Sequence, residues 1–503
     1  MDNKSHWYDW VIINIYWLGS SMIADTMTPL VIPLLVQGFI GEAAKGTAYG
    51  TIRLWSLMIA LLSQSVIGAF SDRSSNPYGK RRPYILAGGL LSLLFMAIIG
   101  FTDRLQGPNG YWVLLILVIL LAISTNSAQA ALQGLIPDLV PAHFRGRFSA
   151  IKAIFEVPLP LILITFTVAR QIASGHLRTG ILTSMAVVAA TLILAMLVPE
   201  KKPSQPSERF HWASVVRLGG MVLLFTGIIL IGGNAIRWLT VLASRIESSR
   251  TLIPFVGLLG LICFLLTIAA GVWFSLKIGL GIESGKNPAF TWWIVNRLAF
   301  MVGATNLGSY ALYFLQARFG FLRESAARPA SLLTMYVGIF ILVFALPSGW
   351  FADRFGRKPL LIASGIVGFL GTGIAIFAPS LSLVYVGGCF IGAAVGIFYT
   401  SNWALGTSLV PNGQEGKYLG ISNLAGAGAG AIGAYIGGPI ADFISRQIPQ
   451  SAGEGYILLF SIYGILFLIS ALAVFGIQDP DQPESSPEPV KIKKPVRSLS
   501  EGL

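Results

Sequence analysis

The sequence predicts an all-α protein that crosses a membrane many times. Of its 503 residues, 54% are hydrophobic and only 11% are charged, whereas charged residues make up about 25% of an ordinary soluble domain. The apolar residues are gathered into long runs, and about 20 such residues span a bilayer as a helix. Short polar loops separate the runs, so too little polar surface remains for a water-soluble fold.

Fourteen runs are long enough to span a membrane. They cover residues 10–36, 47–71, 84–102, 112–136, 149–171, 179–198, 214–241, 251–277, 288–317, 331–351, 359–378, 382–407, 417–443 and 454–477. The order is six spans, a polar linker with two prolines, two more spans and then six. We therefore expect a six-helix half at 1–200, the linker and two extra helices at 201–287, a second six-helix half at 288–478, and a disordered cytoplasmic tail at 479–503.

Basic residues indicate the orientation. Lysine and arginine gather in loops 72–83, 137–149, 199–213 and 352–358, which an even number of spans places on one side with both termini. Cytoplasmic loops carry such an excess, so we expect a multi-pass protein of the cytoplasmic membrane with both termini inside. The same rule explains the net charge of +13 without a nucleic-acid partner. Three arginines between 318 and 328 fall on the opposite side and conflict with this map.

Two charged loops share one pattern: Gly-x-x-x-Asp-Arg, a variable gap, then Gly followed by basic residues. The first copy has Gly68, Asp72, Arg73, Gly79, Arg81 and Arg82, and the second has Gly349, Asp353, Arg354, Gly356, Arg357 and Lys358. A loop repeated in two hydrophobic halves indicates an internal duplication. We expect these residues to control conformation, because each acid can accept hydrogen bonds from a helix N-terminus across the interface between the halves.

The two loops resemble the signature of the major facilitator superfamily, which lies between its helices 2 and 3 and between its helices 8 and 9. Residues 68–85 also look like the corresponding loop of the glycoside–pentoside–hexuronide cation symporters and their sucrose-transporter relatives. The resemblance implies a major facilitator fold and secondary active transport by alternating access. It implies symport of a sugar or glycoside with a proton or sodium ion, by a monomer among membrane lipids and without a cofactor.

Other functions stay open. Lysophospholipid carriers resemble relatives of the symporter family, so an exporter or lipid transporter is one alternative. Proton-coupled peptide transporters also carry two extra central helices, so a peptide-transporter-like carrier is a second. A non-transporting membrane sensor or assembly factor is another. No nucleotide-binding loop or catalytic constellation is present, which argues against an enzyme. The four histidines have no metal-binding spacing, and the two cysteines lie within apolar runs.

Polar residues within the spans are the candidates for the site, because they are costly there. In the first span, Asn14, Ser21, Asp25 and Thr28 share a helical face. Asp25 is our candidate for cation coupling, since its carboxylate could carry a proton, help to bind sodium or accept hydrogen bonds from sugar hydroxyls. The alternative is a structural acid paired with a neighbouring Arg or Asn.

Span 112–136 carries Asn126, Gln129 and Gln133 on one face. This stretch is similar to helix 4 of the sucrose-transporter branch, in which Asn126, Gln129 and Asp138 match by position. The branch's arginine falls at Gln133 here, and its intramembrane acid falls near Ala122. Either Asp25 has taken over proton coupling or the protein is not a proton symporter. Amides can donate to and accept from hydroxyls, which favours a polar solute.

The remaining candidates lie in three other spans. They are the Lys152–Glu156 charge pair, the group Arg297, Asn306, Tyr310 and Tyr313, and the group Tyr399, Asn402 and Trp403. We expect the charge pair to be structural or to act in gating, and the other residues to contact the solute. Arg297 could be the counter-ion of a solute carboxylate or of Asp25, or it could reach the membrane edge. The glycines between 426 and 438 predict a closely packed gating helix.

Overall fold

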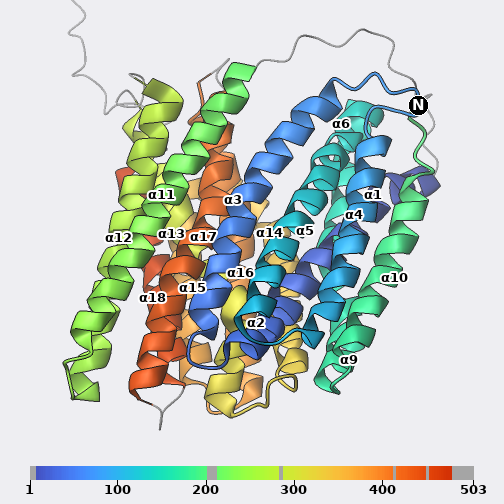
Figure 1. Cartoon of the computed structure of the whole chain (residues 1–503). Coiled ribbons are helices and arrows are strands. Elements are labelled where there is room, and N and C mark those ends of the chain that lie inside the picture. The colour runs from blue at the N-terminus through green and yellow to red at the C-terminus, as the bar shows by residue number, and fades with distance from the viewer. Residues whose placement is uncertain (1–6, 201–211, 282–286, 412–414, 449–452, 478–503) are drawn as a thin grey trace, which may run out of the picture.

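The computed structural model describes residues 7–200, 212–281, 287–411, 415–448 and 453–477, shown as ribbon in Figure 1. Within this part of the chain there is no strand, and 14 helices are long and apolar enough to cross a membrane. The predicted all-α class with fourteen spans is therefore confirmed. The expected tail at 479–503 and most of the linker after residue 200 lie outside the described residues.

Residues 7–195 form the first six spans, which we call the N half. Its elements are α1 (Trp7–Thr26), η1 (Met27–Val31), α2 (Ile32–Ile40), α3 (Lys45–Asp72), α4 (Arg82–Phe101), η2 (Thr102–Arg104), α5 (Gly107–Gln133), α6 (Leu135–Leu139), η3 (Ala142–Phe144), α7 (Arg145–Glu156), α8 (Pro158–Leu163), η4 (Ile164–Val168), α9 (Ala169–Ala173) and α10 (Leu177–Ala195). Pro29 and Pro33 accompany a π-helical turn in the first span, because proline lacks the N–H that continues the α-helical hydrogen bonds.

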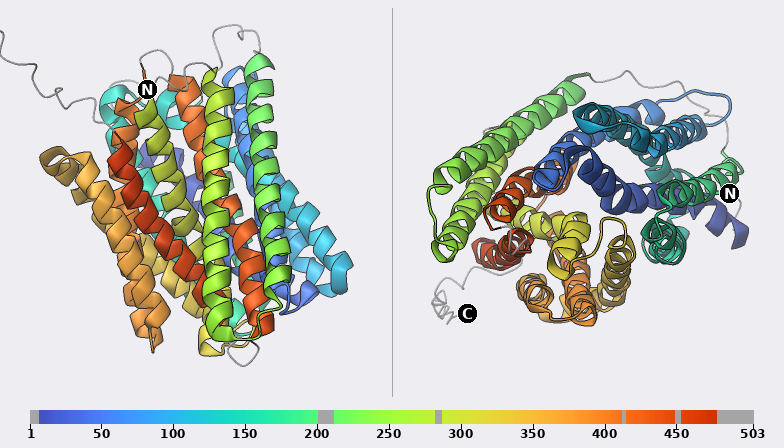
Figure 2. Two further views of the ribbon diagram at one scale, coloured as in Figure 1. Left: turned by 90° about the vertical axis from the view of Figure 1, so that its left-hand side faces the viewer. Right: turned by 60° about the horizontal axis from the view of Figure 1, so that its bottom comes forward.

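Residues 288–476 form the last six spans, which we call the C half. Its elements are α13 (Pro288–Phe319), α14 (Ala327–Phe355), α15 (Arg357–Phe377), α16 (Leu381–Ser408), α17 (Glu415–Gln447), α18 (Glu454–Ala473) and η7 (Val474–Gly476). The two central helices, α11 (Trp212–Ala243) and α12 (Ser249–Leu280), pack on each other and on α17. They lie together along one edge of the molecule (Figure 2), so they border the two halves without separating them.

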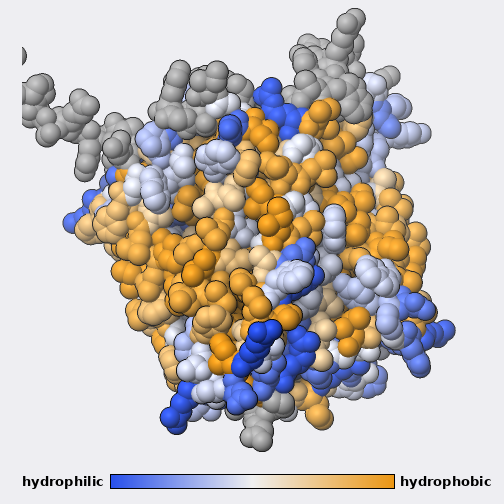
Figure 3. Space-filling model, turned by 60° about the vertical axis from the view of Figure 1, so that its left-hand side comes forward, coloured by the Kyte–Doolittle hydropathy of each residue, from blue (hydrophilic) through white to orange (hydrophobic). Residues whose placement is uncertain are grey.

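The outer surface suits a lipid environment. On one side, hydrophobic residues cover most of the middle of the molecule, and polar residues gather toward its ends (Figure 3). Large apolar side chains such as Leu346, Phe377 and Trp238 are more than three-quarters exposed. Exposed apolar patches of this extent are rare on soluble monomers, which agrees with a multi-pass membrane protein.

Candidate functional site

Hydrogen bonds join the two halves at one end of the described structure. The side-chain hydrogen bonds found between described residues of the two halves involve residues 33–49 or Thr165 of the N half. We call this set of contacts the seal. It lies at the end of the molecule where α2 is drawn in Figure 1, opposite the end that carries α6 and the first charged loop.

Close backbone contact between α3 and α17 forms the centre of the seal. A Cβ added at Gly438 would overlap the backbone of Gly46, and one added at Gly50 would overlap the carbonyl of Ala434. The expected close packing of α17 is thus present at Gly438, although Gly426 has open space beside it. Because the backbones touch, polar groups on both helices come within hydrogen-bonding distance.

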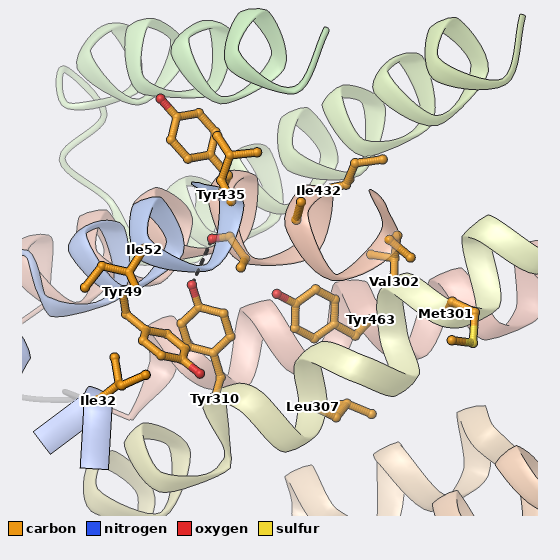
Figure 4. Packing of buried hydrophobic residues seen from close by; sticks show 14 of the residues in the cluster. Ile32, Tyr49, Ile52, Met301, Val302, Leu307, Tyr310, Ile432, Tyr435 and Tyr463 are labelled. Carbon is orange, nitrogen blue, oxygen red and sulfur yellow. Dashed lines mark hydrogen bonds between the residues drawn. The ribbon is translucent and has the colours of Figure 1, made fainter. Parts of the chain in front are cut away.

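Three residues that the sequence proposed as solute contacts lie in this packed region instead. Tyr310 donates its hydroxyl to the carbonyls of Ala434 (2.8 Å) and Gly46 (3.2 Å), and the buried rings of Tyr49, Tyr310 and Tyr463 surround the contact (Figure 4). Tyr313 donates to the carbonyl of Pro33 at 2.7 Å.

Asn306 is the third of the proposed solute contacts that lie in the packed region. Its amide donates to the carbonyls of Val302 and Ala429, and its side chain is fully buried, as are those of Tyr310 and Tyr313. Their shared helical face was predicted, but the face packs against other helices because α17 approaches so closely. In this conformation the three residues stabilise packing and have no surface to offer a solute.

Asp442 is a seal residue that sequence reasoning missed. It is 2% exposed, and its two carboxylate oxygens accept hydrogen bonds from the backbone N–H groups of Gly46 (3.0 Å) and Thr47 (2.7 Å). These are the second and third residues of α3, whose own N-cap position, Ala44, has no capping side chain. A carboxylate of the C half therefore caps a helix of the N half. An acid within a glycine-rich span was the available signal.

Lys45, Glu42 and Gln316 extend the seal to its surface. Lys45 forms an ion pair with Glu42 at 2.7 Å and donates to the Gln316 side chain at 3.0 Å. Burial acts to raise the pKa of the Glu42 carboxyl, but hydrogen bonds from Lys45 and Gln37 and the charges of Lys45 and Arg323 outweigh it. The pKa is consequently lowered from its ordinary value of 4.5.

Charged and aromatic groups meet deeper in the molecule, beyond the seal. Asp25 in α1 is partly exposed, forms no hydrogen bond or ion pair with any described residue, and lies within electrostatic range of Glu156 in α7. Glu156 is paired with Lys152 at 3.3 Å, and the Lys152 ammonium lies 3.8 Å from the ring centre of Trp17. The structure thus pairs Lys152 with Glu156 and leaves Asp25 unpaired beside them.

The C half contributes a polar network around Arg297. Its guanidinium donates to the side chain of Asn402 at 2.8 Å, and Asn402 in turn donates to Asn296 at 3.0 Å. Arg297 is 8% exposed, and its Nε has no hydrogen-bond partner. It does not reach the membrane edge and has no acidic partner among the described residues.

Tyr399 and Trp403 provide accessible aromatic surface beside this network. They are 41% and 48% exposed, and the Arg297 guanidinium lies 6.0 Å from the Trp403 ring centre. Tyr399 lies within electrostatic range of both Arg297 in the C half and Glu156 in the N half. We call Asp25, Glu156, Arg297, Tyr399 and Trp403 the central cluster, since they bring groups of both halves together.

A cavity of about 200 Å³ lies within the N half, between α1, α3 and α5. Its polar lining includes Ser20, Thr28, Arg53, Asn126 and Gln129. Gln129 donates to the Ser20 hydroxyl at 2.9 Å. The predicted pair Asn126 and Gln129 and the predicted Thr28 therefore line one cavity, where the Asn126 amide also donates to the carbonyl of Ala122 at 2.9 Å.

Three predicted residues lie elsewhere. Asn14 is buried and donates to the carbonyl of Phe148, which fixes α1 against α7. Ser21 is also buried and does not line the cavity. Gln133 is exposed at the end of α5, one turn past the cavity. The structure does not bring these three side chains to the cavity.

Arg53 is the cavity residue that sequence reasoning missed. Its guanidinium forms no hydrogen bond or ion pair with any described residue, and its buried Nε has no partner. A terminal nitrogen lies near Gly430 of α17. The signal was present, because an arginine six residues inside a predicted span is costly unless it pairs with an acid or a ligand.

The first charged loop folds within the N half. Arg81 is 4% exposed and forms ion pairs with Asp72 (2.6 Å) and Asp138 (2.9 Å). Gly79 has φ +116°, and a Cβ there would overlap the carboxylate of Glu200. The predicted contact of Asp72 across the halves is therefore not formed in this conformation, in which Asp72 holds its own loop.

Other loop residues have simpler contacts. Arg82 donates to the carbonyl of Met196, and Arg73 donates to that of Ala69. Gly68 packs near Ala130. In the second copy, Arg357 donates to the carbonyl of Ala404 at 3.0 Å, while Arg354 stacks on Trp350.

The second copy otherwise faces solvent. Gly356 has φ +88°, which favours glycine, and Gly349 approaches Thr400. Asp353 is exposed, and Lys358 is partly buried.

Among the described residues, no group of three or more His, Cys, Asp or Glu side chains could hold a metal ion.

Two six-helix halves that share a charged, polar centre define a class of membrane carrier folds, and comparison with known proteins gives the same class. The family model of the Major Facilitator Superfamily matches residues 292–501. This match lies in the second half of the chain and agrees with the family that the two loops predicted. The relatives that the chain matches are transport proteins, not enzymes.

Two curated relatives and one solved structure illustrate the likeness. The chain is 27% identical over 179 residues to the multi-drug resistance efflux pump PmrA of Streptococcus pneumoniae, covering 33% of this chain and 41% of the pump. It is 26% identical over 170 residues to the sucrose transport protein SUT1 of Oryza sativa, covering 25% and 30%. The chain thus matches less than half the length of either relative.

The solved structure of a D-xylose-proton symporter superposes with a TM-score of 0.60 over 94% of this chain and 98% of the symporter, at 18% identity. At this identity the likeness concerns the fold. The predicted resemblance to sucrose transporters is confirmed for the matched stretch.

Proposed function

We propose that the protein is a secondary active transporter that works by alternating access. The observation that carries this proposal is the seal: the hydrogen bonds found between described residues of the two halves gather at one end, while the central cluster keeps accessible side chains of both halves. A carrier must close one end while the other admits solute. Rocking the halves would break the seal and bring Tyr399 and Glu156 closer together.

The orientation follows from the basic loops. Arg73, Arg81 and Arg145 lie at the end opposite the seal, and cytoplasmic loops are rich in such residues. We infer that the seal faces outward, that both termini are cytoplasmic, and that the described conformation faces inward. Arg323, which conflicted with the sequence-based map, donates to the carbonyl of Leu34 and so has a structural role at the sealed end.

The solute we propose is a sugar or glycoside, taken up together with a proton or a sodium ion. Amide and hydroxyl groups line the cavity, and Tyr399 and Trp403 offer aromatic faces on which a sugar ring can stack. Asp25 is the coupling group we propose, because it is an intramembrane acid with no partner among the described residues. The partial match to a sucrose transporter supports this choice.

Export is the second candidate, and the partial match to an efflux pump favours it. Both directions use the same fold and differ in the gradient that drives the cycle. The accessible surfaces of Tyr399 and Trp403 would suit an apolar solute as well as a sugar ring.

Uptake into proteoliposomes tests the proposal. We expect purified protein to accumulate at least one radiolabelled mono- or disaccharide under an inward proton or sodium gradient. Asp25→Asn should abolish accumulation but keep exchange of solute, since exchange needs no net cation movement. The matched control is Asp103→Asn, which removes an acid paired with Arg178 outside the central cluster. Accumulation by Asp25→Asn at the wild-type level would reject the coupling role.

A further inference from the structure

Arg53 and Arg297 place positive charge at membrane depth without acidic partners. Arg53 lies eight residues inside α3 and Arg297 nine residues inside α13, about 12 Å and 14 Å along their helices. Neither forms an ion pair with a described residue, and each has a buried Nε without a hydrogen-bond partner. Charges at this depth are normally paired with one another or with a ligand.

The nearby acids do not balance these charges. Glu156 is paired with Lys152 at 3.3 Å, and Asp25, which has no ion pair with a described residue, lies within electrostatic range of Glu156. With that pair neutral, Arg53 and Arg297 contribute two positive charges and Asp25 one negative charge. The centre of the protein therefore carries one uncompensated positive charge, which one anionic group on the solute would neutralise.

Arg53 is the better placed of the two arginines to bind such a group. It lines the cavity of about 200 Å³, whereas Arg297 already donates to Asn402. One end of its guanidinium lies near Gly430 of α17, so it reaches toward the C half. A guanidinium presents paired N–H donors that match the oxygens of a carboxylate or phosphate.

The rest of the cavity would hold the neutral part of the same molecule. Asn126 and Gln129 offer amide groups, and Ser20 and Thr28 offer hydroxyls, all along the same cavity wall. These groups suit a hydroxylated molecule. A volume of about 200 Å³ is below the 300–1,000 Å³ typical of drug-sized ligands, so the cavity suits a molecule of about one sugar ring.

We propose that the solute is a hydroxylated anion of about one sugar ring, with its carboxylate or phosphate group bound by Arg53. The proposal rests on the transport function above and narrows its solute class. A neutral sugar would leave the Arg53 guanidinium without a partner. The free-energy cost of that unpaired charge would make a neutral sugar bind more weakly than an anion.

Binding to the purified full-length protein tests the proposal with three compounds that share one ring: glucose, glucuronate and glucose 6-phosphate. We expect at least one of the two anions to bind tenfold or more tightly than glucose, and which of them binds identifies the anionic group. Arg53→Gln should weaken its binding by about 10- to 150-fold, the usual effect of losing hydrogen bonds to a charged group. Arg53→Lys keeps the charge and should retain part of the affinity.

Arg237→Gln is the matched control, because Arg237 is an arginine of α11 that stacks on Tyr435 outside the cavity. It should leave anion binding unchanged. The solute proposal would be overturned if glucose bound as tightly as the anions or more tightly, or if a folded Arg53→Gln protein bound the anions as well as the wild type does. In either case, sugar accumulation in proteoliposomes would still support the transport function. Failure of both anions to bind would overturn the solute class alone, whereas failure to accumulate any mono- or disaccharide in proteoliposomes would overturn the sugar transport function.

Discussion

The capping of α3 by Asp442 yields the most specific prediction about the conformational cycle. Opening the sealed end would separate α17 from α3 and break the hydrogen bonds from Gly46 and Thr47 to the Asp442 carboxylate. Asp442→Asn retains one acceptor oxygen and removes the other together with the charge. The substitution should therefore weaken the sealed conformation relative to the open one.

The size of the effect follows from the bonds lost. A hydrogen bond to a charged group contributes about 1.5–3 kcal/mol, and each 1.4 kcal/mol is a factor of about ten in a population ratio. Asp442→Asn should thus raise the ratio of open to sealed molecules by about 10- to 150-fold. The low exposure of Asp442, 2%, means that water does not replace the lost partner while the seal is closed.

Spin-label distances at the sealed end measure this ratio. Cysteines at Gln106 in the N half and Leu322 in the C half, both exposed, would carry the labels after Cys263 and Cys389 are replaced. We expect mainly short distances in the parent protein and a second, longer population in Asp442→Asn. Asp103→Asn, at the same end but within the N half, is the control. Indistinguishable distance distributions for the parent and Asp442→Asn would refute the capping argument.

Three further predictions concern stability. Arg81→Gln breaks ion pairs with Asp72 and Asp138 and should lower the free energy of unfolding by about 2–3 kcal/mol. The exposed pair of Arg178 with Asp103 should contribute far less, and an equal loss of stability in Arg178→Gln would contradict this prediction. Gly79→Ala should be destabilising by about 1–2 kcal/mol, because φ is +116°, whereas Gly308→Ala has open space and should be neutral or stabilising in the same thermal unfolding assay. Because the pKa of Glu42 is lowered, the ionised Glu42 stabilises the folded protein above pH 4.5, and this stabilisation is lost as pH falls through the lowered value. In Glu42→Gln, the unfolding temperature should therefore change less between pH 6 and 3.5 than in the wild type. An unchanged pH profile would reject the interpretation.

The spans and charged loops could be predicted because their signals are local. A run of about 20 apolar residues is sufficient to identify a membrane helix, so all fourteen spans were found. The loop around Asp72 and Arg81 was recognised from spacing within one short segment, and its ion pair joins two residues of that segment. The face shared by Asn126 and Gln129 followed from helical periodicity alone.

Contacts between the halves could not be predicted, because they depend on which helices approach each other. Tyr310 and Tyr313 share a face as expected, but only the close approach of α17 to α3 turns that face into the seal. Asp442 receives its partners from residues almost 400 positions earlier in the chain. The position of Arg53 within an apolar span was a signal in the sequence, but only the three-dimensional structure shows that no described acid pairs with it.

Cross-linking the seal tests alternating access most directly. The hydroxyls of Thr165 and Ser331 lie 2.8 Å apart across the two halves, so cysteines at these positions should form a disulfide that holds the outer end closed. Uptake of the best-accumulated sugar should stop on oxidation and return on reduction, while each single-cysteine variant stays active. Undiminished uptake by the fully cross-linked protein would contradict the account, because solute would then cross without the halves separating at the seal.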